Sequence, residues 1–271
     1  MNNKLVMITG AASGIGKATA ELLHTQGYSL WLIDMNEAAL KTMQQNLPNT
    51  QITVCNLADK KELEMLSEMI TQKTQIDIVF LNAGIVLPGN FIDIPFEKSE
   101  LQLNLNLYST LYLNHVCGIK MKEQGKGHII NTVSMAGIIG LKGSAVYSAC
   151  KFGLRGFLMA FRNEMRPFGV AVSGIYLSAV DTAMLRAEAA DPKGTSLNFL
   201  SEPIEAEKVA KFVLKLLKTK KVEVYMPYID SLTTKFLGAF PLLIPFIYPI
   251  LEIIGERGRK KYIKKLNLLK S

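Results

Sequence analysis

The hydrophobic positions of the chain fall into short apolar runs separated by longer amphipathic stretches. The runs are mostly unbroken series of Val, Ile and Leu, which is typical of parallel strands covered by helices on both faces. They predict seven strands, at Lys4–Thr9, Ser29–Asp34, Ile52–Val54, Asp77–Leu81, His128–Val133, Val170–Leu177 and Val222–Met226. The stretches between them predict helices at Ile15–Gln26, Glu37–Asn46, Lys60–Lys73, Lys98–Glu123, Tyr147–Arg166 and Glu205–Leu217. Strands that alternate with helices imply right-handed crossovers, so we predict an α/β fold with a doubly wound, mainly parallel seven-stranded sheet and helices on both faces.

The alternation of strands and helices continues to about residue 235 without a repeat or a linker, which predicts one domain over residues 1–235. Within it, Met184–Pro203 differs, because it contains Gly194, two prolines and several polar residues. We predict a loop or lid over residues 184–203. Residues 236–271 are first apolar and then basic, which predicts a C-terminal extension that is not a separate domain.

The positive charge is concentrated at one end of the chain. The net charge is +8, but Glu256–Ser271 alone holds seven basic residues and one acidic residue, a net charge of +6. The rest of the chain is close to neutral and carries no recognised nucleic-acid motif, so we expect no nucleic-acid partner. With 49% hydrophobic and 20% charged residues, the chain is not of the disordered class. The seven basic residues are Arg257, Arg259, Lys260, Lys261, Lys264, Lys265 and Lys270.

The cysteines and histidines follow neither a disulfide pattern nor a metal-binding pattern. The three cysteines, Cys55, Cys117 and Cys150, are widely spaced and form no CxxC pair, which favours free thiols in a reducing compartment. The three histidines have no metal-ligand spacing, so we predict no metal site. The first residues contain only a short apolar run and no signal-peptide pattern, which predicts a cytoplasmic protein.

A glycine-rich turn joins the first predicted strand to the first predicted helix. Its residues are Gly10-Ala-Ala-Ser13-Gly14-Ile15-Gly16. Glycines let the backbone approach a pyrophosphate closely, and the helix N-terminus supplies unpaired N–H groups. We therefore predict that Gly10, Ser13, Gly14, Ile15 and Gly16 bind the phosphates of a dinucleotide on a Rossmann-type fold. The alternative is a tight turn that holds no ligand.

An acidic residue, Asp34, ends the second predicted strand 18 residues beyond Gly16. A carboxylate at about this distance accepts hydrogen bonds from the adenosine ribose hydroxyls and repels the 2′-phosphate of NADP. Neither Ser13 nor Met35 supplies a cation for that phosphate, so NAD is favoured over NADP. The competing interpretation makes Asp34 the cap of the helix that follows it.

Several motifs together resemble the short-chain dehydrogenase/reductase family. Thr9–Gly16 matches the TGxxxGxG pattern of that family, Asn82-Ala83-Gly84 matches its NAG motif, and Tyr147-Ser-Ala-Cys-Lys151 matches its YxxxK motif. Ser134 lies thirteen residues before Tyr147, as the family has it, and Asn106 falls where the family places a fourth catalytic residue. The resemblance covers about the first 230 residues and implies that Asn106, Ser134, Tyr147 and Lys151 are catalytic.

The chemistry of these residues suits proton transfer. Tyr147 and Lys151 are four residues apart and share a helix face, so a nearby ammonium is expected to lower the pKa of the phenol from about 10. Tyr147 then exchanges a proton with the substrate oxygen, and Ser134 donates a hydrogen bond to it. By resemblance, Asn106 holds Lys151 through a water molecule.

The resemblance also implies the remaining cofactor contacts. They are Asn56 and Leu57 near the adenine, Asn82, Ala83 and Gly84, Tyr147 and Lys151, and Val180 and Thr182 near the nicotinamide carboxamide. The chain departs from the family at two points. Leu177-Ser178 stands where the family usually has Pro-Gly, which changes the nicotinamide pocket, and Asn56 replaces the usual acid near the adenine.

The resemblance implies an NAD(P)-dependent oxidoreductase that interconverts an alcohol and a carbonyl by hydride transfer. Apolar residues after Gly84, around Ala136–Lys142 and in the lid predict an apolar alcohol or ketone as the substrate. The family also implies a homodimer or homotetramer built on Lys98–Glu123 and Tyr147–Arg166. Two other classes stay open: a non-catalytic NAD(P)-binding sensor and a membrane-docked scaffold on the same fold.

The C-terminal extension begins with an uncharged apolar segment. Phe236–Leu251 is sixteen residues long, shorter than a membrane span of about 20 residues, and Pro241, Pro245 and Pro249 interrupt a simple helix. The basic residues follow directly. This order suits a segment that lies on an anionic membrane surface, and it equally suits a segment that packs on the protein and closes the substrate site or a subunit contact.

Overall fold

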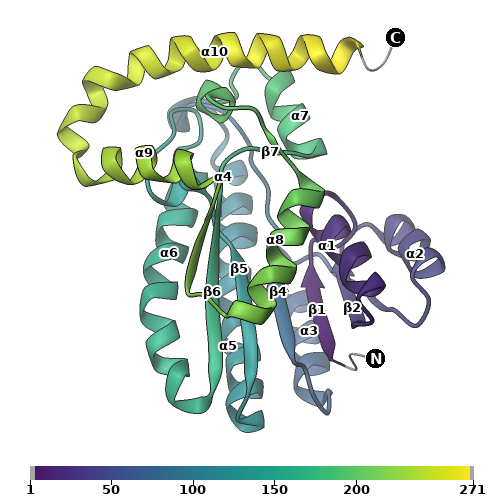
Figure 1. The fold of residues 1–271 in the computed structure, drawn as a ribbon. Coiled ribbons are helices and arrows are strands. Elements are labelled where there is room, and N and C mark those ends of the chain that lie inside the picture. Colours follow the sequence, from purple (N-terminus) through teal and green to yellow (C-terminus); the bar gives the residue numbers. More distant parts are fainter. Residues whose placement is uncertain (1–3, 269–271) are drawn as a thin grey trace.

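The sheet of this protein has seven parallel strands. The computed structural model describes residues 4–268, so Lys270 lies outside the described residues. The strand order is β3-β2-β1-β4-β5-β6-β9, with every neighbouring pair parallel, which confirms the doubly wound sheet (Figure 1). The strands are β1 (Leu5–Thr9), β2 (Ser29–Asp34), β3 (Gln51–Val54), β4 (Ile78–Leu81), β5 (Gly127–Thr132), β6 (Val170–Leu177) and β9 (Glu223–Met226).

Helices cover both faces of the sheet, as predicted. On one face lie α1 (Gly14–Thr25), α2 (Glu37–Asn46) and α8 (Ala206–Thr219), and on the other lie α3 (Lys60–Gln72), α5 (Ser109–Gln124) and α6 (Ala145–Met165). Side chains of β1 alternate between the two cores: Val6 and Ile8 pack towards α1 and α8, whereas Met7 packs on the opposite face. Because both faces are covered, nearly all residues of β1, β2 and β4 are buried, whichever face they point to.

The chain reverses its direction of travel across the sheet between β1 and β4. Strands β2 and β3 extend from one side of β1, and β4, β5, β6 and β9 extend from the other. In open α/β sheets the crevice at the carboxyl ends of such neighbouring strands is where ligands bind. The topology therefore locates the functional site before any side chain is considered.

The predicted helix Lys98–Glu123 is interrupted in the middle. It consists of α4 (Phe96–Leu103), a π-helical turn η2 (Asn104–Tyr108) and α5. A π-helical turn adds a residue to the helix and often occurs at a functional site. Here it contains Asn106, one of the four predicted catalytic residues.

The predicted lid has more regular structure than its glycine and prolines suggested. It contains α7 (Ala183–Ala190) and a 3-10 turn η5 (Ser196–Phe199), and it is bordered by a small sheet of β7 (Val180–Asp181) and β8 (Ile204–Glu205). The expectation of a loop over residues 184–203 was wrong for α7, which begins where the Thr182 hydroxyl accepts a hydrogen bond from the Leu185 N–H, 3.4 Å away.

The C-terminal extension forms two helices that meet at a bend. They are α9 (Tyr228–Ala239) and α10 (Ile244–Leu268), joined by a 3-10 turn η6 (Pro241–Leu243). Residue 235, the predicted domain boundary, falls inside α9. The expected interruption by prolines occurs only at Pro241, because Pro245 lies in the first turn of α10 and the helix continues through Pro249.

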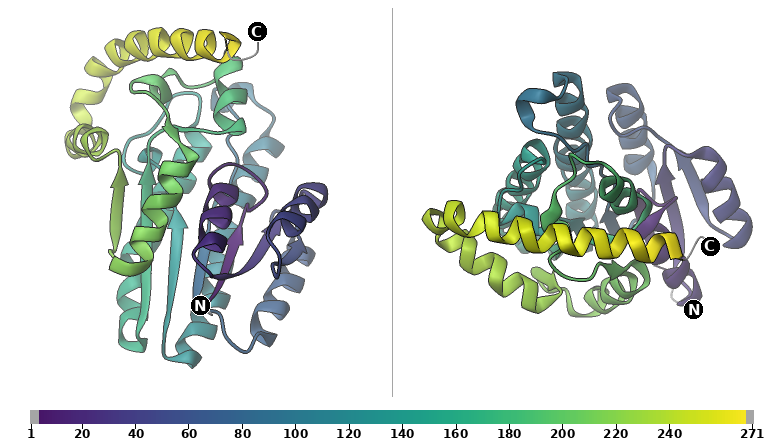
Figure 2. Two further views of the ribbon diagram at one scale, coloured as in Figure 1. Left: turned by 45° about the vertical axis from the view of Figure 1, so that its right-hand side comes forward. Right: turned by 90° about the horizontal axis from the view of Figure 1, so that it is seen from above.

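Helix α10 lies across the end of the molecule opposite the N-terminus, over the lid (Figures 1 and 2). Gly255 and Gly258 allow a close approach, since a Cβ at Gly255 would be 2.3 Å from the Ser196 carbonyl oxygen and one at Gly258 would be 2.0 Å from that of Phe199. Tyr262 packs with Phe199, and its hydroxyl donates to Asp181 at 2.6 Å. The basic half of the extension therefore packs on the body, whereas the packing alternative expected the apolar segment to pack there and the basic end to be free.

Within residues 4–268 no single helix is long and apolar enough to cross a membrane. The pair formed by Tyr228–Ala239 and Pro241–Leu268 meets that test of length and composition only together, with a bend of 94° between them.

Candidate active site

A cavity of about 650 Å³ opens at the carboxyl ends of the strands, beneath the lid and the C-terminal helices. Its volume is in the usual range for ligand sites. All but two of the residues predicted for the site line this cavity, although they come from segments spread over more than 170 positions of the sequence. They are Gly10, Ser13, Gly14, Ile15, Asp34, Asn56, Leu57, Asn82, Ala83, Gly84, Ser134, Tyr147, Lys151, Val180 and Thr182.

The glycine turn is held against the segment that follows β4. Thr9 Oγ1 accepts hydrogen bonds from the backbone N–H groups of Asn82 and Ala83, at 3.0 and 3.2 Å. The Asn82 side chain donates to the carbonyl of Gly10 at 3.3 Å. Gly10 has a φ of +63°, and a Cβ there would be 2.8 Å from the Ala83 Cα, so only glycine fits.

The N-terminus of α1 is open towards the cavity. Ser13 is the N-cap residue, yet its side chain makes no capping hydrogen bond. The first N–H groups of α1 and the positive end of its dipole therefore suit the pyrophosphate of a dinucleotide. Gly16 is different from its neighbours in the turn: it is buried, it does not line the cavity, and a Cβ there would be 2.0 Å from the Gly10 carbonyl oxygen. Gly16 therefore packs α1 on the turn, and its predicted cofactor contact stays a prediction.

Asp34 ties β2 to the glycine turn. Its carboxylate accepts hydrogen bonds from the N–H groups of Ala12 and Asn36, each 3.0 Å away. The N-cap of α2 is Asn36, whose side chain accepts from the Ala39 N–H at 3.0 Å. The interpretation of Asp34 as the helix cap was therefore wrong, and its carboxylate lies at the cavity.

Asn56 forms a turn after β3. Its side-chain oxygen accepts a hydrogen bond from the Ala58 N–H at 3.1 Å, while its backbone N–H donates to Glu62 at 2.7 Å. These bonds hold Asn56 and the buried Leu57 at the end of the cavity nearest to β3.

Ser134, Tyr147 and Lys151 lie together at the end of β5 and on the first turns of α6. The Ser134 side chain hydrogen-bonds Tyr147, and Ser134 Oγ also accepts from the Ala136 N–H at 3.1 Å. Lys151 Nζ donates to the Thr132 carbonyl at 2.8 Å and lies 5.5 Å from the centre of the Tyr147 ring. Lys151 is buried, and this burial lowers its pKa to about 8.

The electrostatics of Tyr147 differ from the prediction. Burial is the largest influence on the pKa of Tyr147 and raises it, the Ser134 hydrogen bond lowers it, and the nearby Glu188 raises it further. The expected net lowering of this pKa was wrong for the ligand-free protein, because the loss of hydration on burial is the largest influence and disfavours the phenolate. Tyr147 is therefore a protonated phenol at neutral pH, the form that donates a proton to a carbonyl oxygen.

Asn106 does not line the cavity. It is fully buried in the π-helical turn, where its side chain accepts from the Ile85 N–H and donates to the Ile85 carbonyl, both at 2.8 Å. These two bonds fix the chain just after Gly84, so in this structure Asn106 is a positioning residue for that segment. The predicted link to Lys151 through a water molecule stays a prediction.

The segment that departs from the family pattern also lines the cavity. Thr182 caps α7, and its hydroxyl donates to the Val180 carbonyl at 3.2 Å. Ser178 Oγ is buried at the cavity, where the described residues give it no hydrogen-bond partner. An unpaired buried hydroxyl is costly, so this position favours a polar ligand group.

The substrate half of the cavity contains residues that the sequence did not reveal. Glu188 of α7 is 5% exposed, its Oε1 has no hydrogen-bond partner among the described residues, and burial raises its pKa to about 7. Interactions with Thr195 and Asn198 oppose that rise. Glu188 was missed because the lid was predicted as a loop; the helical stretch Ala183–Ala190 was the signal that would have revealed it.

Comparisons with known proteins match the part of the chain that contains most of this site. A model of the short chain dehydrogenase family matches residues 4–193. An uncharacterised oxidoreductase of Staphylococcus aureus (strain N315) is 32% identical over 191 residues, which are 69% of this chain and 82% of that protein. The 3-oxoacyl-acyl-carrier-protein reductase of Rickettsia prowazekii (strain Madrid E) is 35% identical over 192 residues, which are 70% of this chain and 76% of that protein.

Solved structures share the fold. The short-chain dehydrogenase from Sphingobium yanoikuyae in complex with NADPH has a TM-score of 0.77 at 22% identity and covers 88% of this chain and 95% of its own. A short-chain dehydrogenase/reductase from Burkholderia phymatum in complex with NAD has a TM-score of 0.77 at 20% identity and covers 86% and 92%. The family match spans the glycine turn and the Ser134, Tyr147 and Lys151 group, and this chain is an oxidoreductase that belongs to the short-chain dehydrogenase/reductase family.

Proposed function

We propose that this protein interconverts an apolar alcohol and the corresponding ketone or aldehyde, with NAD preferred over NADP. The observation that carries the proposal is one cavity that contains both the open N-terminus of α1 and the Ser134, Tyr147 and Lys151 group. A sensor requires the first feature only, so the second favours catalysis over the sensor and scaffold alternatives.

The residues divide the chemistry between them. Bound NAD(P) supplies or accepts the hydride. Ser134 donates a hydrogen bond to the substrate oxygen, and Tyr147 donates its proton to that oxygen in the direction of reduction. Lys151 is held by the Thr132 carbonyl and keeps a positive charge beside the phenol, so it offsets the negative charge that Tyr147 gains when the proton leaves.

The lining of the cavity supports an apolar substrate. Ile85, Val86, Leu141, Met184 and Leu185 surround its substrate half, together with Leu251 and Ile254 from α10. Ser178 fits a polar group of the nicotinamide, since its buried hydroxyl has no partner among the described residues. The Rickettsia relative is named for reduction of a 3-oxoacyl group, which places an oxo group on an aliphatic chain within the proposed substrate class.

The charges of the lining support NAD. Lys151 is the only basic residue among the described residues that line the cavity, and Asp34 lies at the other end of the binding site.

We therefore expect kcat/KM to be at least about tenfold higher with NAD than with NADP, since a carboxylate without a cation disfavours the 2′-phosphate of NADP. The measurement is turnover of secondary alcohols of increasing chain length with each cofactor. Replacing Asp34 with Ala should narrow the ratio of kcat/KM between NAD and NADP, with the exposed Glu64→Ala as the surface control. A parent enzyme that prefers NADP would contradict this assignment, and no turnover with any alcohol or ketone would leave the sensor as the better account.

We also propose a homodimer or homotetramer built on α5 and α6. These helices, with η2, carry the exposed apolar side chains Tyr108, Ile119, Phe152 and Met159, each 43–46% exposed. Burying them against a second copy removes apolar area from water. Light scattering on the purified protein should give a molar mass of two or four chains, and Phe152→Asp with Met159→Asp should give one. A monomeric parent would contradict the proposal.

A further inference from the structure

The two C-terminal helices carry a row of exposed apolar side chains that nothing in the described chain covers. On α9 this row is Ile229, Leu232 and Phe236, followed by the C-cap residue Phe240; they are spaced three or four residues apart and so share one helix face. It continues through the bend, where Leu242 and Phe246 are 85% and 78% exposed. A surface helix of a water-soluble protein usually has polar residues on its outer face, so this row indicates a contact with something apolar.

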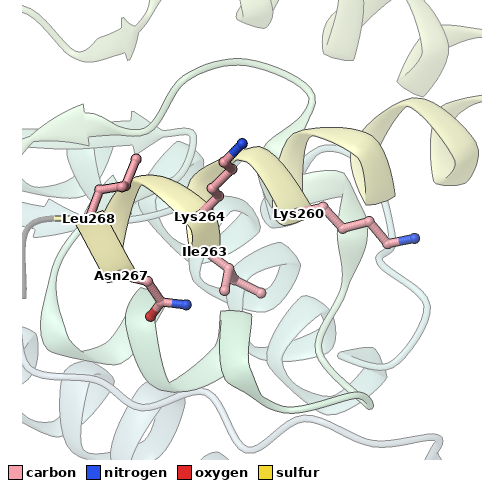
Figure 3. A pocket seen from close by; sticks show the side chains of 5 residues that line it. All are labelled: Lys260, Ile263, Lys264, Asn267 and Leu268. Carbon is pink, nitrogen blue, oxygen red and sulfur yellow. The ribbon is translucent and has the colours of Figure 1, made fainter. Parts of the chain in front are cut away.

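The outer face of α10 changes its chemistry along the helix. Phe246, Ile250 and Ile253 are exposed in its first half, and at the same three- or four-residue spacing Arg257, Lys260 and Lys264 are exposed in its second half. In Figure 3 the side chains of Lys264 and Leu268 rise on one side of α10, whereas Ile263 and Asn267 lie on the other. We call the apolar row of α9, Leu242 and this face of α10 together the C-terminal outer surface.

The C-terminal outer surface has no free negative charge. Residues 228–268 contain three acids. Asp230 lines the active-site cavity, where it accepts from the Ser201 hydroxyl at 2.7 Å, whereas Glu252 pairs with Lys142 at 3.0 Å and Glu256 pairs with Arg259 at 3.1 Å. A second copy of the chain would bring the same positive charges to the contact. The surface is therefore complementary to a partner that has an apolar region next to a negatively charged region.

We propose that the C-terminal outer surface docks on the face of an anionic lipid bilayer. The apolar side chains enter the boundary between headgroups and acyl chains, and the basic half of α10 lies against the anionic headgroups. The 94° bend between α9 and the segment that ends with α10 presents Leu242 and Phe246 at its tip. The packing of Tyr262 and Gly258 on the lid holds the helix in this orientation.

Docking would place the bilayer next to the active-site cavity. Thr233 and Thr234 of α9 and Leu251 and Ile254 of α10 line that cavity. Thr233 and Ile254 lie one helix turn after Ile229 and Ile250 of the C-terminal outer surface, so the surface adjoins the cavity. An apolar alcohol or ketone dissolved in the bilayer then reaches the cavity between α9 and α10. This second step rests on the proposed function, whereas docking itself does not.

The test uses the full chain and vesicles of phosphatidylcholine with or without about one third phosphatidylserine, at low and high salt. We expect co-sedimentation with the anionic vesicles that weakens at high salt. An apolar variant and a charge variant should each lower the partition coefficient by about a hundredfold. They are Leu242→Ser with Phe246→Ser and Ile250→Ser, and Arg257→Gln with Lys260→Gln and Lys264→Gln.

Two matched controls alter exposed residues elsewhere and should bind like the parent. They are Met65→Ser with Met69→Ser and Ile92→Ser, and Lys211→Gln with Lys215→Gln and Lys218→Gln. Circular dichroism and a thermal melt establish that each variant is folded.

Several results would overturn docking: no vesicle binding by the parent, equal binding to neutral and anionic vesicles, or equal binding by the parent and both variants. A parent dimer that the apolar variant dissociates would assign the surface to a second copy instead. For substrate entry, the charge variant should raise KM for a long-chain alcohol embedded in vesicles and leave KM for a short soluble alcohol unchanged. Vesicle binding without any turnover would reject the proposed function and keep the docking.

Discussion

Replacement of Tyr147 with Phe is expected to lower kcat by about a thousandfold or more, within the range for loss of a positioned proton donor. Tyr147 is the one phenol in the cavity among the described residues; burial keeps it protonated, and the hydrogen bond to Ser134 orients its hydroxyl. The ring itself stays, so the packing and the dissociation constant for NAD should change by less than about threefold. Steady-state turnover and calorimetric NAD binding measure the two quantities.

The control for Tyr147→Phe is Tyr225→Phe, because the Tyr225 hydroxyl bonds Glu223 and does not line the cavity. It removes a hydroxyl of the same chemistry and should leave kcat within about twofold. Near-parental turnover by Tyr147→Phe on any accepted substrate would reject the proposed role of the phenol.

Replacement of Glu188 with Gln is expected to stabilise the ligand-free protein at pH 8 and to change little at pH 4. Burial raises the pKa of Glu188 from 4.5 to about 7 in the folded state. The folded protein therefore holds this proton more tightly than the unfolded chain, and the free energy of unfolding falls as the pH rises from about 4.5 to about 7. Gln carries no charge to bury, so it avoids this loss, up to about 3 kcal/mol above pH 7.

Urea denaturation at pH 4, 6 and 8 measures the effect of Glu188→Gln, with the exposed Glu207→Gln as control. The difference in unfolding free energy between the variant and the parent should grow with pH for position 188 and stay near zero for position 207. A constant difference at all three pH values would show that Glu188 acts through packing and not through its charge.

The sheet and the cofactor turn were predictable because local sequence determines them. The apolar runs that end at Thr9, Asp34 and Leu177 are buried strands, which must be covered by helices on both faces of the sheet. The predicted strand ends are within two residues of the observed ones. Gly10 adopts a positive φ, which glycine does without steric cost, so the sequence itself indicates a tight turn there. Parallel strands then bring Asp34, Asn82 and Ser134 to one edge without any knowledge of the packing.

The features that were missed depend on contacts distant in the sequence. Asn106 was placed on a regular helix, but the bonds to Ile85 and the π-helical turn arise only when that helix meets the chain after Gly84. The pKa of Tyr147 was predicted from a neighbour four residues away, whereas burial by the whole fold decides it. Likewise, the close contact between Gly258 and Phe199 joins segments about sixty residues apart, and no local pattern indicates it.

The close packing of α10 on the lid limits which segments can be exchanged between relatives in a chimera. The family match ends at residue 193, and Gly255, Gly258 and Arg259 contact the chain at Asp191, Ser196 and Phe199, where that shared sequence runs out. The lid and α10 therefore form one structural unit, which could be exchanged as a whole on top of the part of the chain that matches the family. A chimera that receives residues 184–268 from a donor keeps the contacts between α10 and the lid, and we expect it to show the substrate specificity of the donor. A chimera that receives only the lid places Gly255 and Gly258 of α10 against the donor's lid backbone. We expect the packing of α10 on the lid to be lost in such a chimera, so that it does not acquire the donor's specificity.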